Sequence, residues 1–151
     1  HMATAITESL FTLVYPRLFR TERVGKKAVI SCVANEYHQI GAKMVADAFE
    51  LNGWDSYFLG ANTPVADLID LVSETRPDVV GLSLAVYSNL PQLNDAIEQL
   101  KSRFSDVDVL VGGQAFQRGG IEVLKRYPGV TYVSSVRELD HMITEDERSG
   151  Q

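Results

Sequence analysis

The chain has 151 residues, of which 45% are hydrophobic and 23% charged, and its formal net charge is −6. These values are typical of one soluble globular domain that is large enough to bury a core. The net negative charge, without any block of lysine and arginine, argues against direct binding of nucleic acid. No apolar run reaches the length of about 18 residues that a membrane span requires.

The first expected element is one short helix. Apolar residues recur at helical spacing between Ile6 and Leu18, and the pattern breaks before Gly25. We interpret residues 3–25 as a short helical segment, either complete in itself or the remnant of a helical cap. At the other end, the polar stretch 145–151 is expected to be a flexible tail.

Strands and helices are expected to alternate five times between these ends. Continuous apolar runs predict strands that are covered on both faces, at 27–33, 55–59, 79–83, 107–111 and 130–133. Helical periodicity predicts the intervening helices, at about 42–51, 65–76, 90–100, 121–127 and 136–144. Thr63 is expected to cap the second helix, with Pro64 as its first residue.

The first strand contains the only cysteine of the chain, Cys32. We interpret it as a small buried strand residue. Because one cysteine cannot form a disulfide within the chain, a reducing, cytoplasmic location is expected.

Five such repeats predict an α/β fold with a doubly wound parallel sheet. The expected strand order is 2-1-3-4-5, the flavodoxin-like arrangement, in which ligands bind at the carboxyl ends of the strands beside the switch point between strands 1 and 3. Three loops are therefore candidates for a functional site: 34–41, 83–89 and 112–116.

The loop after the first strand contains a carboxylate two residues before a histidine, Glu36 and His38. Such a carboxylate can hold one imidazole nitrogen by a hydrogen bond and leave the other nitrogen for a metal. Gly41 lets the chain pass close to a bulky ligand where the next helix begins. By itself the pattern is weak, because a lone loop histidine is more often a solvated or capping residue.

Small and hydroxyl residues follow the third and fourth strands. The third strand leads into the sequence SLAVYSN at 83–89, and the fourth ends in Gly112 and Gly113. Adjacent glycines allow an extended group to lie flat along the sheet edge, although a plain turn needs them equally.

Motifs for the other common cofactors of this fold are missing from these loops. The first loop has neither the G-x-G-x-x-G pattern of nicotinamide sites nor a P-loop. It is also poor in the serine and threonine that a flavin phosphate requires. A receiver domain would place an aspartate at the end of the third strand, where Ser83 stands.

Together, the three loops resemble the cobalamin-binding domain family. Its members carry D-x-H-x-x-G after strand 1, S-x-L after strand 3 and G-G after strand 4. The corresponding residues here are Glu36, His38 and Gly41, then Ser83, Leu84 and Ala85, then Gly112 and Gly113. The resemblance covers about residues 26–144, which we take as the domain.

The resemblance implies a base-off, histidine-on corrinoid site. His38 would be the lower ligand of the cobalt, with Glu36 as its hydrogen-bond partner. Ser83 would contact the buried base of the nucleotide tail, and the glycine pair would line its channel. Asn89 stands where relatives carry a hydroxyl that extends the acid–histidine relay. The full set of expected cofactor-binding residues is Glu36, Tyr37, His38, Gln39, Ile40, Gly41, Ser83, Ala85, Tyr87, Asn89, Gly112 and Gly113.

Three residues depart from the family pattern. Glu36 replaces an aspartate, and Ala85 replaces the leucine of S-x-L. Tyr87 is bulkier than the usual residue, so that it either fills the space left by Ala85 or blocks the channel. These departures leave altered affinity open, and they leave heme as an alternative tetrapyrrole.

The chain shows no nucleophile–base pair and no metal-hydrolysis site, so we interpret it as a cobalamin-binding module with no catalytic residues of its own. The expected role is sensory or regulatory. One alternative is a corrinoid methyl carrier that serves a methyltransferase. Another is a variant that binds heme, or that has lost its cofactor and binds proteins. The resemblance also implies another protein or domain over the upper corrin face.

Overall fold

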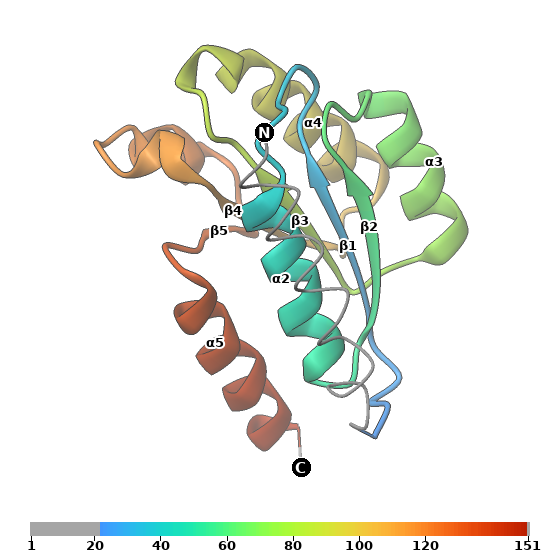
Figure 1. Ribbon diagram of the computed structural model, residues 1–151. Coiled ribbons are helices and arrows are strands. Elements are labelled where there is room, and N and C mark those ends of the chain that lie inside the picture. Colours follow the sequence, from blue (N-terminus) through green and yellow to red (C-terminus); the bar gives the residue numbers. More distant parts are fainter. Residues whose placement is uncertain (1–21, 151) are drawn as a thin grey trace.

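A five-stranded parallel sheet forms the centre of the computed structural model, which describes residues 22–150. The helix expected within 3–25 therefore falls almost entirely outside the described residues. The strands lie in the order β2-β1-β3-β4-β5, which confirms the predicted topology (Figure 1). They are β1 (Lys27–Cys32), β2 (Asp55–Gly60), β3 (Val79–Ser83), β4 (Asp108–Gly112) and β5 (Val130–Tyr132).

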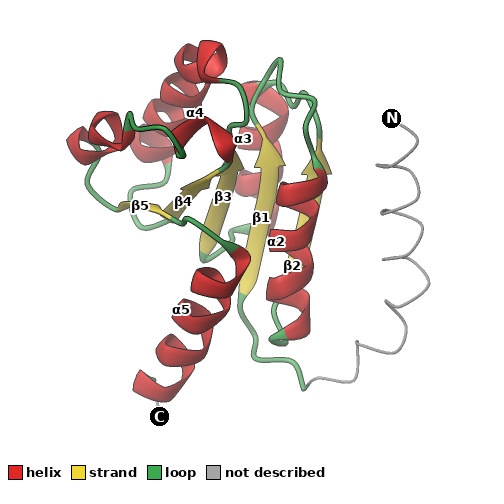
Figure 2. Cartoon of the chain, turned by 60° about the vertical axis from the view of Figure 1, so that its left-hand side comes forward, coloured by secondary structure: helices red, strands yellow, loops and turns green. Residues whose placement is uncertain are grey.

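Helices cover both faces of the sheet, with α2 and α5 on one side and α3 and α4 on the other (Figure 2). Their bounds are α2 (Ile40–Leu51), α3 (Val65–Thr75), α4 (Leu90–Arg103) and α5 (Val136–Ser149). Short 3₁₀ helices occupy Tyr87–Asn89, Gln114–Phe116 and Ile121–Arg126. No helix in the described part of the chain is long and apolar enough to cross a membrane.

The central strand β1 is buried on both faces, as its continuous apolar run predicts. Val29 packs in the core beneath α3 and α4, whereas Ala28, Ile30 and Cys32 pack in the core beneath α2 and α5. Because successive side chains of a strand point to opposite faces, this one segment anchors both cores. Burial of Cys32 confirms its interpretation as a strand residue.

The ends of two helices differ from the sequence-based expectation. Pro64 takes the cap position of α3 that was expected for Thr63, because the Thr63 hydroxyl instead donates to the Gly60 carbonyl at 3.2 Å. Helix α5 continues to Ser149, so most of the expected tail is helical. An ion pair between Lys26 and Asp146, with an N–O distance of 2.7 Å, connects this last turn to the residue before β1.

The segment around 121–127 forms a 3₁₀ helix where a short helix was expected. It begins after Gly120, which has a φ of +91°, and it stops before Pro128. A proline cannot donate a helical hydrogen bond and restricts the residue before it, which limits the element to this length.

Candidate functional site

The carboxyl ends of the central strands bring the three candidate loops to one edge of the sheet. Cys32 pairs with Ser83, and Ser83 pairs with Gly112, in the parallel registers of β1 with β3 and of β3 with β4. The loop that carries His38 leaves β1 at this same edge (Figure 1). The sequence-based prediction that His38, Ser83 and Gly112 lie at one end of the sheet is confirmed.

Glu36 and His38 form a hydrogen-bonded pair in the first of these loops. The Glu36 side chain is completely buried, whereas that of His38 is 71% exposed. The Nδ1 atom of His38 lies 2.8 Å from Oε1 of Glu36. An ionised carboxylate can only accept, so Nδ1 carries a proton, and in the neutral imidazole Nε2 then keeps its lone pair. Nε2 makes no hydrogen bond with any residue of 22–150, and this leaves it able to bind a metal.

Glu36 also holds the loop that follows β3. Its second carboxylate oxygen, Oε2, accepts the backbone N–H groups of Ala85 at 2.9 Å and Val86 at 3.0 Å. Oε1 accepts the backbone N–H of His38 at 3.2 Å in addition to the ring N–H. The carboxylate therefore meets four donors and no acceptor.

These four donors keep Glu36 ionised despite its burial. Burial alone would raise the pKa of the Glu36 carboxyl, but hydrogen bonds from the ring of His38 and from the N–H groups of Val86, His38 and Ala85 outweigh it. The net effect lowers the pKa of Glu36 below its ordinary value. The imidazole thus has a permanent negative partner at neutral pH.

Asn89 does not extend this pair in the way the resemblance implied. Its side-chain Nδ2 donates to the backbone carbonyl of Asn35 at 3.1 Å. The second oxygen of Glu36 instead accepts the backbone N–H groups after β3. Asn89 therefore supports the backbone of the loop, and it does not touch the carboxylate.

Cys32 lies directly beneath the histidine loop. Its thiol is within 3.6 Å of the His38 carbonyl oxygen, which makes it a weak donor there. Burial, reinforced by the charge of Glu36, raises the pKa of Cys32 to about 12. The thiol is therefore a packing group and has no ligand character of its own.

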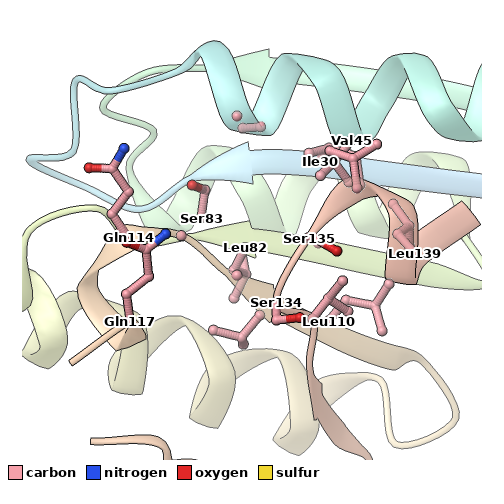
Figure 3. Close-up of a pocket in the computed structure, with 18 residues that line it drawn as sticks. Ile30, Val45, Leu82, Ser83, Leu110, Gln114, Gln117, Ser134, Ser135 and Leu139 are labelled. Carbon is pink, nitrogen blue, oxygen red and sulfur yellow. The ribbon is translucent and has the colours of Figure 1, made fainter. Parts of the chain in front are cut away.

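A cleft of about 190 Å³ opens beside this loop, between α2 and α5 and above the ends of β3 and β4 (Figure 3). Ile30 and Leu110 from the strands form much of its apolar floor, and Val45 of α2 faces Leu139 of α5 across it. Polar groups at its rim come from Ser83, Gln114, Gln117, Ser134 and Ser135.

Glycines shape the walls of the cleft. A Cβ atom at Gly41 would meet no atom within 4 Å, so that residue leaves open space at the start of α2. A Cβ atom at Gly81 would lie 2.7 Å from Cδ1 of Ile30. At Gly113, which has a φ of +115°, it would lie 2.1 Å from the carbonyl oxygen of Leu84. The backbone can follow this path only where no side chain is present.

The structure divides the expected site residues into two groups. Gly41, Ser83, Gly112 and Gly113 line the cleft. Seven others lie in or beside the histidine loop without lining it, namely Glu36, Tyr37, His38, Gln39, Ile40, Ala85 and Asn89.

Tyr87 is the remaining expected residue, and its ring packs beside Gly120 at the protein surface. A Cβ atom on Gly120 would lie 2.8 Å from that ring. Tyr87 therefore neither fills nor blocks the cleft.

Sequence reasoning missed the contribution of the fifth strand and of α5. Ser134 and Ser135 follow Val133, the first residue after β5, and border the cleft, and Leu139 closes it from α5. A signal was present, because the rule that ligands meet the carboxyl ends of parallel strands applies equally to β5. A pair of serines at that position is the pattern that would have pointed to the rim.

In the described part of the chain, no cluster of potential metal ligands surrounds His38. The residues from 22 to 150 contain no group of three or more His, Cys, Asp and Glu that could hold a metal ion. A metal bound at His38 must therefore bring most of its ligands with it, as the metal of a tetrapyrrole does.

A model of the B12 binding domain family matches residues 26–138. The chain belongs to the B12-binding domain family. Cobalamin is accordingly its cofactor class, as the three loop motifs implied.

Curated relatives of this family member include a regulator and a corrinoid protein. The HTH-type transcriptional repressor CarA of Myxococcus xanthus is 29% identical over 141 residues, which cover 92% of this chain and 47% of the repressor. Dimethylamine corrinoid protein 3 of Methanosarcina acetivorans is 32% identical over 83 residues, or 54% of this chain and 39% of that protein. The chain thus spans about half the length, or less, of these relatives.

Solved structures share the fold. The monomethylamine corrinoid protein of Methanosarcina barkeri superposes with a TM-score of 0.76 at 13% identity, covering 92% of this chain and 66% of that chain. A cobalamin-binding protein of Desulfitobacterium hafniense DCB-2 superposes with a TM-score of 0.70 at 24% identity, covering 80% of this chain and 58% of that chain.

Proposed function

We propose that this B12-binding domain holds cobalamin with Nε2 of His38 on the cobalt and with the nucleotide tail in the cleft between α2 and α5. The observation that carries the proposal is the buried, ionised Glu36, which fixes one nitrogen of an exposed imidazole and leaves the other open. The module would serve a sensory or regulatory role in the protein to which it belongs.

The residues present fit the two parts of this cofactor. When bound, cobalamin supplies a cobalt ion already ringed by corrin nitrogens, which is what a lone histidine ligand requires. The cleft offers an apolar floor with a few hydroxyl and amide groups at its rim, the usual make-up of a site for a flat aromatic group. Gly41 leaves open space in its wall.

The extent of the two relationships favours the regulatory role. The relationship to the Myxococcus repressor covers 92% of this chain, whereas that to the Methanosarcina corrinoid protein covers 54%. A methyl-carrying role is the second candidate, since the latter relationship has the higher identity, 32% against 29%. Both roles use the same site.

Reconstitution with hydroxocobalamin tests the cofactor and its ligand together. We expect a coloured protein whose absorption spectrum, and whose electron paramagnetic resonance spectrum after reduction of the cobalt to Co(II), show histidine on the metal. His38→Ala should lose that signature, whereas His141→Ala, on exposed surface of α5, should keep it. An unchanged spectrum in His38→Ala would show that His38 is not the ligand. Binding of hemin without binding of cobalamin would favour the heme-binding variant. A protein that stays colourless after addition of either hemin or hydroxocobalamin would favour a variant without a cofactor.

A comparison of cofactor forms separates the two roles. If the module is sensory, the methyl, adenosyl and hydroxo forms should produce different hydrogen–deuterium exchange in segments outside the cleft, because a sensor must convert the state of the cofactor into a change of the protein. A carrier needs no such difference. Identical exchange patterns for all three forms would therefore support the methyl-carrier role and count against the sensory one.

A further inference from the structure

The backbone of the histidine loop is held by one residue from a different part of the chain. Asn62, in the loop between β2 and α3, accepts the backbone N–H of Asn35 on its Oδ1 atom at 2.8 Å. The backbone N–H of Asn62 in turn donates to the carbonyl of Glu36 at 2.7 Å. These two bonds hold the backbone on either side of the peptide unit that joins Asn35 to Glu36.

A third bond fastens the other side of His38 to the same neighbouring loop. The side-chain Oε1 of Gln39 accepts the backbone N–H of Ala61 at 3.1 Å. The loop that contains Ala61 and Asn62 therefore holds the histidine loop both before and after His38. The side chain of Glu36 is fixed independently, from the opposite side, by the backbone after β3.

Asn62 is suited to this place by its backbone conformation. It has a φ of +48°, in the left-handed region that asparagine, aspartate and glycine tolerate better than other residues. That conformation directs its N–H and its side-chain oxygen to the same short stretch of the histidine loop. Asn35, its partner, is also left-handed, with a φ of +66°, and its carbonyl is held by Asn89.

We infer that Asn62 is a positioning residue for the cobalt ligand. It fixes the backbone of Asn35 and Glu36, and through Glu36 it fixes the direction in which Nε2 of His38 points. The inference rests on the proposed function, because it concerns the ligand that His38 provides. Second-sphere groups of this kind orient the ligand that binds the metal and tune how well it binds.

Two substitutions at Asn62 separate the hydrogen bond from the backbone conformation. Asn62→Gly keeps the left-handed conformation without strain but removes the acceptor for the Asn35 N–H. Asn62→Asp keeps an acceptor oxygen at the same place. Arg76→Gly is the matched control, since Arg76 has the same φ of +48° at the end of α3, outside the site.

The measurement is the fraction of bound methylcobalamin in the histidine-on form, read from its absorption spectrum while circular dichroism shows each variant to be folded. Methylcobalamin is chosen because its carbon ligand weakens the bond on the opposite face, so that the equilibrium is not saturated. Asn62→Gly should lower the ratio of histidine-on to histidine-off protein by about two- to tenfold, the effect of one hydrogen bond. Asn62→Asp and Arg76→Gly should stay close to wild type.

The outcomes distinguish this inference from the proposed function. If wild type shows no histidine-on form and His38→Ala changes nothing, the proposed function itself fails. If wild type shows that form and Asn62→Gly shows it equally, Asn62 has only a structural role and the inference is wrong. A loss in Asn62→Gly that Asn62→Asp fails to restore, or that Arg76→Gly reproduces, would also overturn it, because the effect would then not come from the acceptor oxygen.

Discussion

Glu36→Gln should destabilise the folded protein even without cofactor. The carboxylate accepts four N–H groups, two on each oxygen, and its side chain is completely buried. A glutamine of the same size has one carbonyl oxygen and one NH₂ group. If the NH₂ group faces Ala85 and Val86, two backbone N–H donors lose their acceptor. If it faces His38, the backbone N–H of His38 loses its acceptor, whereas the ring can move its proton to Nε2 and accept from the NH₂ group on Nδ1.

The expected loss follows from the less costly orientation, in which one buried backbone donor is unmet. A hydrogen bond to a charged group contributes about 1.5–3 kcal/mol. Removal of a buried charge offsets part of this, because the charge no longer has to be desolvated. We therefore expect the free energy of unfolding to fall by about 1–3 kcal/mol at neutral pH.

The pH dependence of this loss has a definite sign. The pKa of Glu36 is lowered in the folded protein, so its ionised form contributes stability that is fully present above the ordinary pKa of a glutamate and is lost as the pH falls through the folded pKa. Wild type should lose this contribution on acidification, whereas Glu36→Gln has none to lose. The gap between the two proteins should therefore narrow as the solution becomes acidic.

Urea unfolding of the cofactor-free proteins at several pH values measures both effects. Glu138→Gln is the matched control, because hydrogen bonds from Ser134 also lower the pKa of Glu138 but its side chain is exposed at the start of α5. Glu138→Gln should lower the free energy of unfolding much less than Glu36→Gln does. Equal stability of Glu36→Gln and wild type, or a gap that does not change with pH, would refute the reasoning that Glu36 is a buried anion holding four donors.

Two further predictions concern the glycines of the cleft. Gly41→Leu should leave the thermal stability unchanged or raise it, because glycine in a helix is less favourable than other residues by roughly 1 kcal/mol. The same substitution should weaken the binding of cobalamin more than that of cobinamide, which lacks the nucleotide tail. If calorimetry shows equal losses of affinity for both ligands, the tail lies elsewhere. Gly113→Ala should lower the free energy of unfolding in urea by about 3 kcal/mol or more, because its Cβ would meet the Leu84 carbonyl oxygen. Gly119→Ala is the control, since Gly119 has a similar φ of +113° but no atom within 4 Å of its Cβ position, and it should lower the free energy of unfolding less. Equal losses in the two variants would mean that only the backbone angle matters.

The fold was predictable because each element has a local signal. The apolar run of β1 and the helical spacing in α3 and α4 are properties of adjacent residues, and the strand order follows from their alternation. The end of α5 was not predictable in this way. Its last turns are polar, and one of them is connected to the sheet by the ion pair of Asp146 with Lys26, which are far apart in the sequence.

The candidate site was predictable only in part, for a similar reason. The spacing of Glu36 and His38 indicates that they can bond, and the structure has that bond. From the sequence, Glu36 would act on His38 alone, so that its loss would leave the fold intact. Its burial, and its two bonds to Ala85 and Val86, depend on how the loops after β1 and β3 approach each other. The distance between these two loops cannot be read from the spacing of residues in the sequence.

The two halves of the site divide the work of holding the cofactor. One imidazole is a weak anchor for a large molecule, so most of the binding free energy has to come from the cleft and its apolar walls. Under the proposed function, His38 would act on the cobalt without being needed to retain the cofactor. The backbone joins both halves, because Leu84 pairs with Gly112 and Ala115 while the next two residues hold Glu36. In the proposed arrangement, the state of the cobalt ligand would therefore change while the tail stays bound, as a sensory module requires.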